Sequence, residues 1–586
     1  MGLDTLIFRS GLPAAGRAAF RRLVPASVRG LGTKQQPIDQ LVLSPQDLRT
    51  ADPSFASEIY HGHFGLAGSV ALVGSDSSPF QVIPPSRAWE RDLHGFGWLR
   101  HLSAAGDEIS REHARALVRD WLKLHGRPGG MAWQADLLSR RVISWLSHSR
   151  IFLENADQRF YGMVTESLTR QVRHLRANFH EAPPGAPRLV ALAALVFADL
   201  CTSEKYTAEA GESRLFCDEL NRQILGDGGH ISRNPLVLID LLLDLLPMRQ
   251  CFIARDVPPP DSLISAIDRM MPMIRFFRLG DGNLARFNGG GPTPTDRLAA
   301  VVAHDDAMGS PLMLAEQSGY CRLEQGEGIV LVDCGRPPPV AVSVAAHAGC
   351  LAFEMSTASH PIIVNCGAPT RQDADWRLAA RASAAHSTLI VSDASSSQLR
   401  SGGDDFDGKE LAVLSGPANV TARVETIDGV QELRASHDGY NQRFGITHTR
   451  KLGLSASGET LTGTDTLIVP RGLKGEARGN GGEFAIRFHL HPFVSVELSD
   501  DKRTALLTLP NHVGWQLTSK NEPLTIEESV FLADNRGPRR AEQVVLYSTM
   551  GLATEKQIDW VLEKSAAGPE PDLKPVDEDL LAEEED

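Results

Sequence analysis

The chain has 586 residues, of which 42% are hydrophobic and 23% charged, and its formal net charge is −14. This composition is typical of soluble globular proteins, and the length predicts two or more domains, because a single hydrophobic core rarely grows so large. The negative charge argues against nucleic acid as the main partner, and no stretch has the ~18 to 20 apolar residues that a transmembrane segment requires.

The N-terminal lead-in, residues 1–85, is mixed in pattern and rich in turns. It contains small and basic residues but no apolar run followed by a cleavage-like site, so it does not match a secretory signal peptide. The seven cysteines are scattered and show no C-x-x-C spacing, which favours buried thiols in a reducing compartment. We therefore expect a cytoplasmic location, with a periplasmic one as the alternative. The sequence does not indicate an oligomeric state.

Residues 86–310 show the pattern of amphipathic helices with short Gly and Pro breaks. Leu137, Leu138, Val142, Trp145 and Leu146, for example, recur at intervals of three and four and form one apolar stripe. Short connections of this kind favour antiparallel helical hairpins. The helices are predicted at Glu112–His125, Trp133–His148, Tyr161–Asn178, Arg188–Leu200, Glu212–Ile224, Pro235–Leu246 and Asp261–Phe277.

One segment of this helical region, residues 227–235, combines charge with a helix start. Asn234 suits the N-cap and Pro235 the first helical position, so free backbone N–H groups and partial positive charge are expected there. His230 and Arg233 lie just upstream, and together these groups could hold a carboxylate. A well-capped helix whose Arg and His make structural contacts is the equally open alternative.

After residue 310 the sequence pattern changes to short runs of alternating apolar and polar residues, separated by Gly, Asn, Asp and Pro. This pattern predicts an antiparallel sheet domain over 311–565. The tail, 566–586, carries nine carboxylates against one lysine without aromatic residues and is predicted to be disordered. The strands are predicted at Gly328–Cys334, Val340–Val344, Leu411–Leu414, Ala422–Ile427, Phe444–Leu452, Leu461–Ile468, Phe484–His491, Ala505–Leu509, Leu524–Phe531 and Val544–Ser548.

The sheet region offers further polar groups at strand ends and on one strand face. His347, Arg381 and His386 follow or precede short apolar runs, where a sheet can hold them close together. Further along, Arg487 and His489 share the strand face opposite to a core face. A polar outer sheet face is the simpler interpretation of that second pattern.

Three motifs of the sheet region resemble the C-terminal domain of heparinase II/III-like polysaccharide lyases. The family pattern is a His-x-His-x-Asp run, an apolar strand ending in Asp-x-Gly, and an Arg followed by Ala-His-Asn-Thr. The matching positions are Ala345–Gly349, Val364–Gly367, and Arg381 with Ala385–Thr388. The resemblance spans residues 85–560 and implies an incomplete α/α toroid followed by a large antiparallel β-sandwich, with the site between them.

Several chemical residues of the family pattern are replaced. The family's Gly-Asn-His is Gly185-Ala186-Pro187 here, where the neighbouring Arg188 could take over carboxylate binding or be an exposed first-turn residue. The catalytic tyrosine is absent after Asn234, and Ala345 stands at the family's first histidine.

The resemblance also bears on a metal. In zinc-containing relatives the positions equivalent to His347, Asn365 and His386 coordinate the ion. Asn365 supplies only a neutral amide oxygen, a poorer ligand than a carboxylate. We therefore predict no cofactor, while a structural zinc stays open.

The leading hypothesis is a lyase that cleaves an acidic, uronate-containing polysaccharide by β-elimination. In it, His230, His347 and His386 handle protons, while Arg188, Arg233, Asn234 and Arg381 bind the substrate. The alternative is a non-catalytic glycan-binding or envelope-assembly protein on the same scaffold. Hydrolysis by paired carboxylates is the weaker third possibility, because no Asp/Glu pair stands out.

Overall fold

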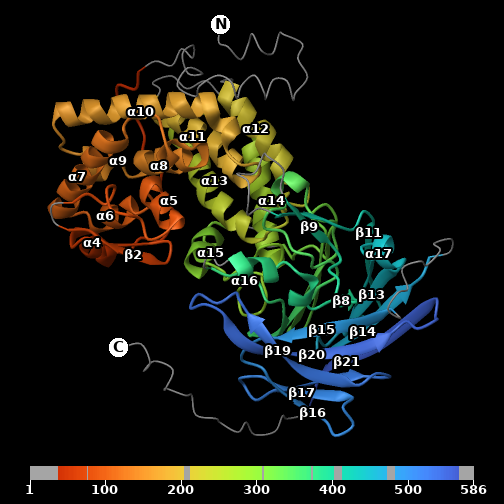
Figure 1. Cartoon of the computed structure of the whole chain (residues 1–586). Helices are drawn as coiled ribbons and strands as arrows, with labels where there is room; N and C mark the ends of the chain where they lie inside the picture. Colours follow the sequence, from red (N-terminus) through yellow and green to blue (C-terminus); the bar gives the residue numbers. More distant parts are fainter. Residues whose placement is uncertain are drawn as a thin grey trace, which may run out of the picture. The chain divides into compact units, whose positions relative to one another are not determined.

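The computed structural model describes residues 37–74, 77–202, 211–305, 309–370, 374–401, 412–470 and 482–565. The predicted acidic tail and the first 36 residues of the N-terminal lead-in lie outside these ranges. The chain divides into two compact units (Figure 1). Unit 1 holds residues up to 232 together with 236–274 and 294–309, and unit 2 holds 233–235, 275–293 and the chain from 310 onward. Among the described helices, none is long and apolar enough to cross a membrane.

Unit 1 is built almost wholly from helices, drawn from orange to yellow-green in Figure 1. Its elements are α4 (Pro53–Tyr60), β1 (His63–Leu66), β2 (Ser69–Leu72), α5 (Arg87–Gly95), α6 (Leu99–Ala105), α7 (Glu108–His125), η1 (Met131–Trp133), α8 (Ala135–Ser147), α9 (Ser149–Leu153), α10 (Gln158–Asn178), η2 (Phe179–Glu181), α11 (Ala186–Thr202), α12 (Gly211–Gln223), α13 (Leu236–Ala254), α14 (Asp261–Phe277, whose last three residues belong to unit 2) and α15 (Thr295–Val302).

The central helices of unit 1 are α8, α11 and α13, and their sequences explain why. α11 and α13 are apolar on nearly all sides, which is the pattern of a helix covered by neighbours all round, and α11 packs against α8, α12 and α13. The predicted stripe on α8 is buried. Asp107 and Asp157 are the N-cap residues of α7 and α10, and each side chain accepts a backbone N–H of the first turn.

Unit 2 consists of two large antiparallel sheets and a small hairpin. The nine-stranded sheet has the order β19 (Leu524–Phe531), β20 (Arg539–Thr549), β15 (Glu483–Leu490), β7 (His360–Val364), β6 (Phe353–Thr357), β5 (Gly328–Asp333), β4 (Tyr320–Gln325), β3 (Leu314–Ala315), with β8 (Leu389–Val391) also pairing with β15. The eight-stranded sheet has the order β11 (Val420–Ile427), β12 (Val430–His437), β13 (Thr447–Leu454), β14 (Thr460–Ile468), β21 (Glu555–Lys564), β18 (Gly514–Ser519), β17 (Thr504–Thr508), β16 (Ser495–Leu498). The hairpin is β9 (Gln398–Ser401) with β10 (Ala412–Ser415), and the short helices are η3 (Val340–Val342), α16 (Ala374–Ala379), η4 (Ser383–Ala385) and α17 (Asn441–Phe444).

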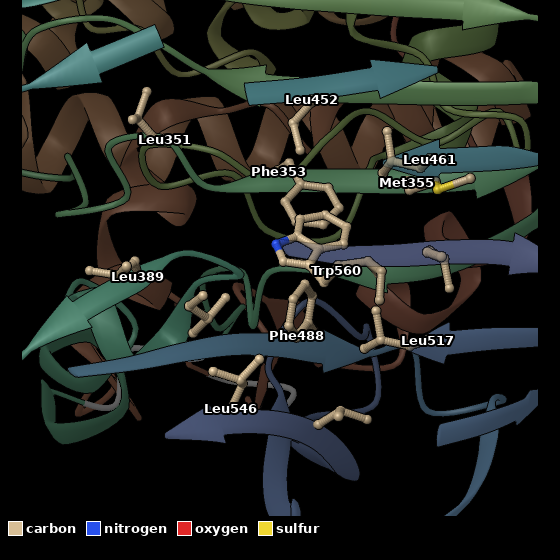
Figure 2. Close-up of a cluster of buried hydrophobic side chains, with 14 of the residues drawn as sticks. Leu351, Phe353, Met355, Leu389, Leu452, Leu461, Phe488, Leu517, Leu546 and Trp560 are labelled. Atoms are coloured by element: carbon tan, nitrogen blue, oxygen red, sulfur yellow. The ribbon is translucent and has the colours of Figure 1, made fainter. Parts of the chain in front are cut away.

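The core of unit 2 lies between the two large sheets. Figure 2 shows Trp560, from β21 of the eight-stranded sheet, among Phe353 and Phe488 from the nine-stranded one. The rings of Phe353 and Trp560 are stacked with centroids 5.7 Å apart, and Phe488 meets Trp560 edge-on at 4.9 Å. Aromatic pairs in these geometries add to the free energy gained from burying their large apolar areas. This cluster joins the sheets into one sandwich.

Most predicted strands are present, but the strand at Val340–Val344 is wrong. Those residues start with the 3₁₀ helix η3, directly after Pro339, and Val340 is 55% exposed. Proline lacks the N–H that a sheet ladder needs, and the preceding run Pro337–Pro339 therefore keeps this segment out of the sheet. Phe444, predicted as the start of a strand, ends the short helix α17, and β13 begins at Thr447. Helix α13 likewise begins at Leu236, one residue after the proline predicted to open it.

Candidate functional site

The clearest polar constellation in unit 2 is a pair of buried histidines. His347 Nδ1 lies 3.1 Å from His386 Nε2, and the two rings meet edge to face. His386 Nδ1 donates to the carbonyl oxygen of Ala382 at 2.8 Å. That bond leaves His386 Nε2 as an acceptor, so the proton between the rings belongs to His347 Nδ1. The sequence placed these two histidines at neighbouring strand ends, and the fold brings them together.

Burial keeps both imidazoles neutral. It lowers the pKa of His386 to about 4 and the pKa of His347 well below its usual value, the latter with help from the charges of His386 and Arg381. The His386 ring also packs closely against Gly349, where a Cβ would come within 2.7 Å of the ring. The pair is therefore held in position by packing as well as by hydrogen bonds.

Two asparagines fix the backbone around the pair. Asn288 Oδ1 accepts the backbone N–H of His347 at 3.2 Å, and Asn365 Oδ1 accepts that of Ser387 at 3.0 Å. Asn288 adopts a left-handed conformation with φ 48°, a region that asparagine tolerates better than most residues. Its Nδ2 donates to Tyr320 Oη and to a carboxylate oxygen of Asp333.

Arg381 lies beside the pair and donates to backbone carbonyls. Its Nε reaches Ala346 O at 2.8 Å, and one of its terminal nitrogens reaches Ser343 O at 3.1 Å. Burial, and then the charge of Arg377, lower the pKa of Arg381 to about 10. These contacts hold the loop that carries His347.

Arg233 belongs to unit 2, whereas His230 of the predicted carboxylate-binding corner belongs to unit 1. Its guanidinium donates to Asp333 at 2.5 Å and to the carbonyl oxygens of Ser318, Gly319 and Arg336. It also lies over the ring of Tyr320, 4.7 Å from the centroid. Asn234 belongs to the same three-residue segment of unit 2.

His230 and Arg188 lie in unit 1, where both bind the chain itself. His230 Nε2 donates to Gln223 Oε1 at 2.9 Å, and its Nδ1 accepts from the backbone N–H of Ser232. Burial lowers the pKa of His230 to about 3. Gln223 in turn donates to the carbonyl of Gly185, so its side chain links His230 to the turn before Arg188. Arg188 donates to the carbonyl oxygens of His180 and Ala182.

The residues that the resemblance implies for zinc do not form a metal site. Asn365 directs its oxygen to Ser387, and its Nδ2 is buried with no hydrogen-bond partner. In the part of the chain that the structure describes, no group of three or more His, Cys, Asp or Glu side chains could hold a metal ion. The donor set of two imidazoles and an amide N–H is unsuited to zinc.

Unit 1 also contains a cavity of about 820 Å³ that the sequence did not predict. Its polar lining consists largely of arginine–aspartate pairs: Asp244 binds both Arg49 and Arg140, and Arg91 binds Asp136. Phe55 and Trp98 supply apolar surface. The contributing residues come from the segment before α4 and from α4, β1, α5, α6, α8, α11, α13 and α15, and no local motif in the sequence connects them.

Sequence reasoning also missed the charged partners that organise unit 2. Asp333 ends β5 and pairs with Arg233, and the fully buried Glu354 on β6 pairs with Arg286 at 3.0 Å. A charged residue inside an apolar strand was the available signal, since such a residue needs a partner. His489, predicted on a polar outer face, is buried; its Nε2 donates to Ala384 O and its Nδ1 bonds Ser529.

The C-terminal part of the chain matches a known family, and known structures match along most of its length. Residues 307–561 match the family described as Heparinase II/III-like, C-terminal. Crystal structures of heparan sulfate lyase HepC from Pedobacter heparinus (TM-score 0.62, 15% identity, 97% of this chain and 92% of that one) and of Heparinase III (TM-score 0.69, 13% identity, 94% and 91%) share the fold. The chain belongs to the heparinase II/III-like family, with a helical toroid followed by a large antiparallel β-sandwich.

Among curated proteins the chain is similar to "FtsZ-localized protein C" of Caulobacter vibrioides (strain NA1000 / CB15N). The two are 34% identical over 527 residues, which cover 89% of this chain and 90% of the relative.

Proposed function

We propose that this protein is a non-catalytic member of the heparinase II/III-like family that works in envelope assembly in association with FtsZ. The observation that carries the non-catalytic part is the closed hydrogen bonding of two of the three predicted catalytic histidines. Both ring nitrogens of His230 and both of His386 are bonded to groups of the chain itself. An imidazole in that state has no nitrogen left to exchange a proton with a substrate.

The absence of the family's tyrosine and of its Gly-Asn-His asparagine from the sequence supports the same proposal. β-Elimination next to a carboxylate needs a base at the carbon that loses its proton and a group that neutralises the carboxylate. Of the two arginines predicted to bind the carboxylate near these positions, Arg233 is paired with Asp333, and Arg188 donates to the carbonyl oxygens of His180 and Ala182.

The association with FtsZ is supported by the similarity to FtsZ-localized protein C. That relative is 34% identical over nine-tenths of both chains, whereas the two solved lyases named above are 13–15% identical. Similarity of this extent over both units supports a partner shared with that relative. A likeness of fold alone would give weaker support.

Fluorescence microscopy tests the association directly. A fluorescent fusion of the full chain, expressed in its own host, should localise with FtsZ, and the purified chain should bind purified FtsZ saturably. A fusion that stays diffuse, together with no measurable binding in vitro, would exclude the FtsZ part of the proposal.

The second candidate is the polysaccharide lyase, which the fold and the retained His347–His386 pair favour. It predicts a new conjugated double bond, seen as ultraviolet absorbance, when the protein meets the right polyuronide or glycosaminoglycan. We expect no absorbance change across a broad panel of acidic polysaccharides. Turnover that is abolished by His386→Ala would establish the lyase and reject the non-catalytic proposal.

A further inference from the structure

We propose that His347 and His386 share a proton where zinc-containing relatives hold a metal, and that the side-chain amide of Asn365 is the group that excludes a divalent cation. The inference concerns the buried pair itself. It goes beyond the proposed function and holds for either candidate.

The spacing of the two imidazoles does not by itself exclude a metal. Two nitrogens bound to one tetrahedral zinc lie roughly 3.3 Å apart, given bond lengths near 2.0 to 2.1 Å. The 3.1 Å between His347 Nδ1 and His386 Nε2 is close to that value. Whether the pair can hold an ion therefore depends on Asn365, which stands at the third ligand position of the zinc-containing relatives.

The amide of Asn365 is locked in one orientation. Its Oδ1 accepts the backbone N–H of Ser387 at 3.0 Å, so a flipped amide would set N–H against N–H. The backbone N–H of Asn365 donates to Glu354 Oε1 at 2.9 Å, which holds the main chain in place. Nδ2 is the end that remains, and it is buried without a partner. An amide N–H group repels a cation and has no lone pair to offer.

The neighbouring carboxylate cannot take over the role. Glu354 is fully buried and already binds the guanidinium of Arg286 at 3.0 Å as well as the backbone of Asn365. Among the described residues, no Asp or Glu side chain joins the two imidazoles in a group that could hold a metal ion. A proton between the rings therefore satisfies the pair at a lower electrostatic cost than a doubly charged ion.

A single substitution, Asn365→Asp, should allow the histidine pair to bind a divalent cation. In Asn365→Asp, one carboxylate oxygen keeps the hydrogen bond from Ser387, and the other replaces Nδ2 with an anionic ligand. Two imidazoles, one carboxylate and a water make the four-coordinate set that zinc prefers. The variant also removes the unpartnered donor.

The test is a titration of the metal-free full-length chain with Co²⁺ and Zn²⁺. Asn365→Asp should bind one ion per chain at least about 100-fold more tightly than the wild type, and its Co²⁺ form should show the visible absorption of a tetrahedral complex. Asn511→Asp is the matched control: Asn511 Oδ1 also accepts a backbone N–H, from Val513, but in an exposed turn. It should bind no better than the wild type.

The wild-type protein provides a second measurement that does not depend on the folding of a variant. After exposure to excess Zn²⁺ and gel filtration, elemental analysis should find well under one zinc per chain. Stoichiometric zinc in the wild type that His386→Ala removes would overturn the inference. So would a folded Asn365→Asp protein, judged by its thermal unfolding, whose affinity equals that of the wild type.

Discussion

Arg233 illustrates how a residue that suggests a binding role from its sequence context takes a structural one. Its φ of 61° places it in the left-handed region, and that turn directs the side chain into unit 2. There the guanidinium neutralises Asp333 and satisfies three carbonyl oxygens. Because both charges are buried, each depends on the other: removing one leaves the second without compensation.

Arg233→Met should lower the free energy of unfolding by about 3–5 kcal/mol, because it leaves Asp333 as an uncompensated buried charge. Adding Asp333→Asn should recover a large part of that loss, since the double variant buries no charge. Urea unfolding of the two single variants and the double one measures the coupling. Arg434→Met is the control, because the Arg434–Glu432 pair is largely exposed on the arginine side, and should cost no more than about 1 kcal/mol. Equal losses at both arginines would contradict the interpretation.

The sequence predicted some of these residue positions and could not predict others. His347 and His386 were expected to lie close together, because both stand at ends of short apolar runs, where a sheet can hold them near each other. The engagement of His386 with Ala382 and of His230 with Gln223 depends on local turns, which residue type alone does not specify. The pairing of Arg233 with Asp333 joins positions 100 apart in sequence, and only the folded chain shows it.

At the scale of elements, periodicity predicted most helices and strands, and the failures have local causes. Intervals of three and four residues located α8 and α10, and alternation located β14 and β15, whose inward residues belong to the core. The strand predicted at 340–344 is wrong because the prolines just before these apolar residues keep the segment out of the sheet. Which strands neighbour one another was not predictable, since β15 pairs with β20, β7 and β8 across long stretches of sequence.

The pairing of β14 with β21 depends on a glycine opposite a tryptophan. Gly463 faces Trp560 across the ladder, and a Cβ on Gly463 would lie 2.1 Å from the indole ring. Gly463→Ala should therefore displace the central ring of the core and destabilise the protein by about 1–3 kcal/mol. Gly162→Ala, the matched change within α10, meets open space and should stabilise by about 0.5–1 kcal/mol. Chemical unfolding measures both; a neutral Gly463→Ala would show that the indole ring can shift without loss.

At the scale of the whole molecule, buried neutral histidines set the response to acid. Burial lowers the pKa of His230 to about 3, of His386 to about 4 and of His489 to about 3. The unfolded chain binds protons at these residues near the ordinary value of 6.5, so between pH 6.5 and 4 the unfolded state holds more protons than the folded one. Burial also raises the pKa of Asp199 to about 6 and raises the pKa values of Asp92 and Glu354, and these three carboxyl groups act in the opposite direction.

We therefore expect stability to be fully present above pH 6.5 and to fall as the pH decreases toward 4, with each such histidine contributing up to about 1.4 kcal/mol per pH unit. Thermal unfolding from pH 7.5 to 4.5 measures this slope. His489→Gln should flatten it by one histidine's share, because glutamine does not titrate, while the exposed His63→Gln should leave it unchanged. A slope that is the same in all three proteins would refute the assignment of His489.

The discontinuous make-up of unit 2 has a practical consequence for anyone who wishes to produce the β-sandwich separately. A fragment cloned from residue 310 onward would contain Asp333 and Glu354 but would omit Arg233, Arg286 and Asn288. Asp333 and Glu354 would then be buried without the arginines that pair with them. The loop bearing His347 would also lose the hydrogen bond to Asn288. Such a truncation should aggregate on expression. A fragment that starts before Arg233 would keep residues 233–235 and 275–293, which belong to unit 2.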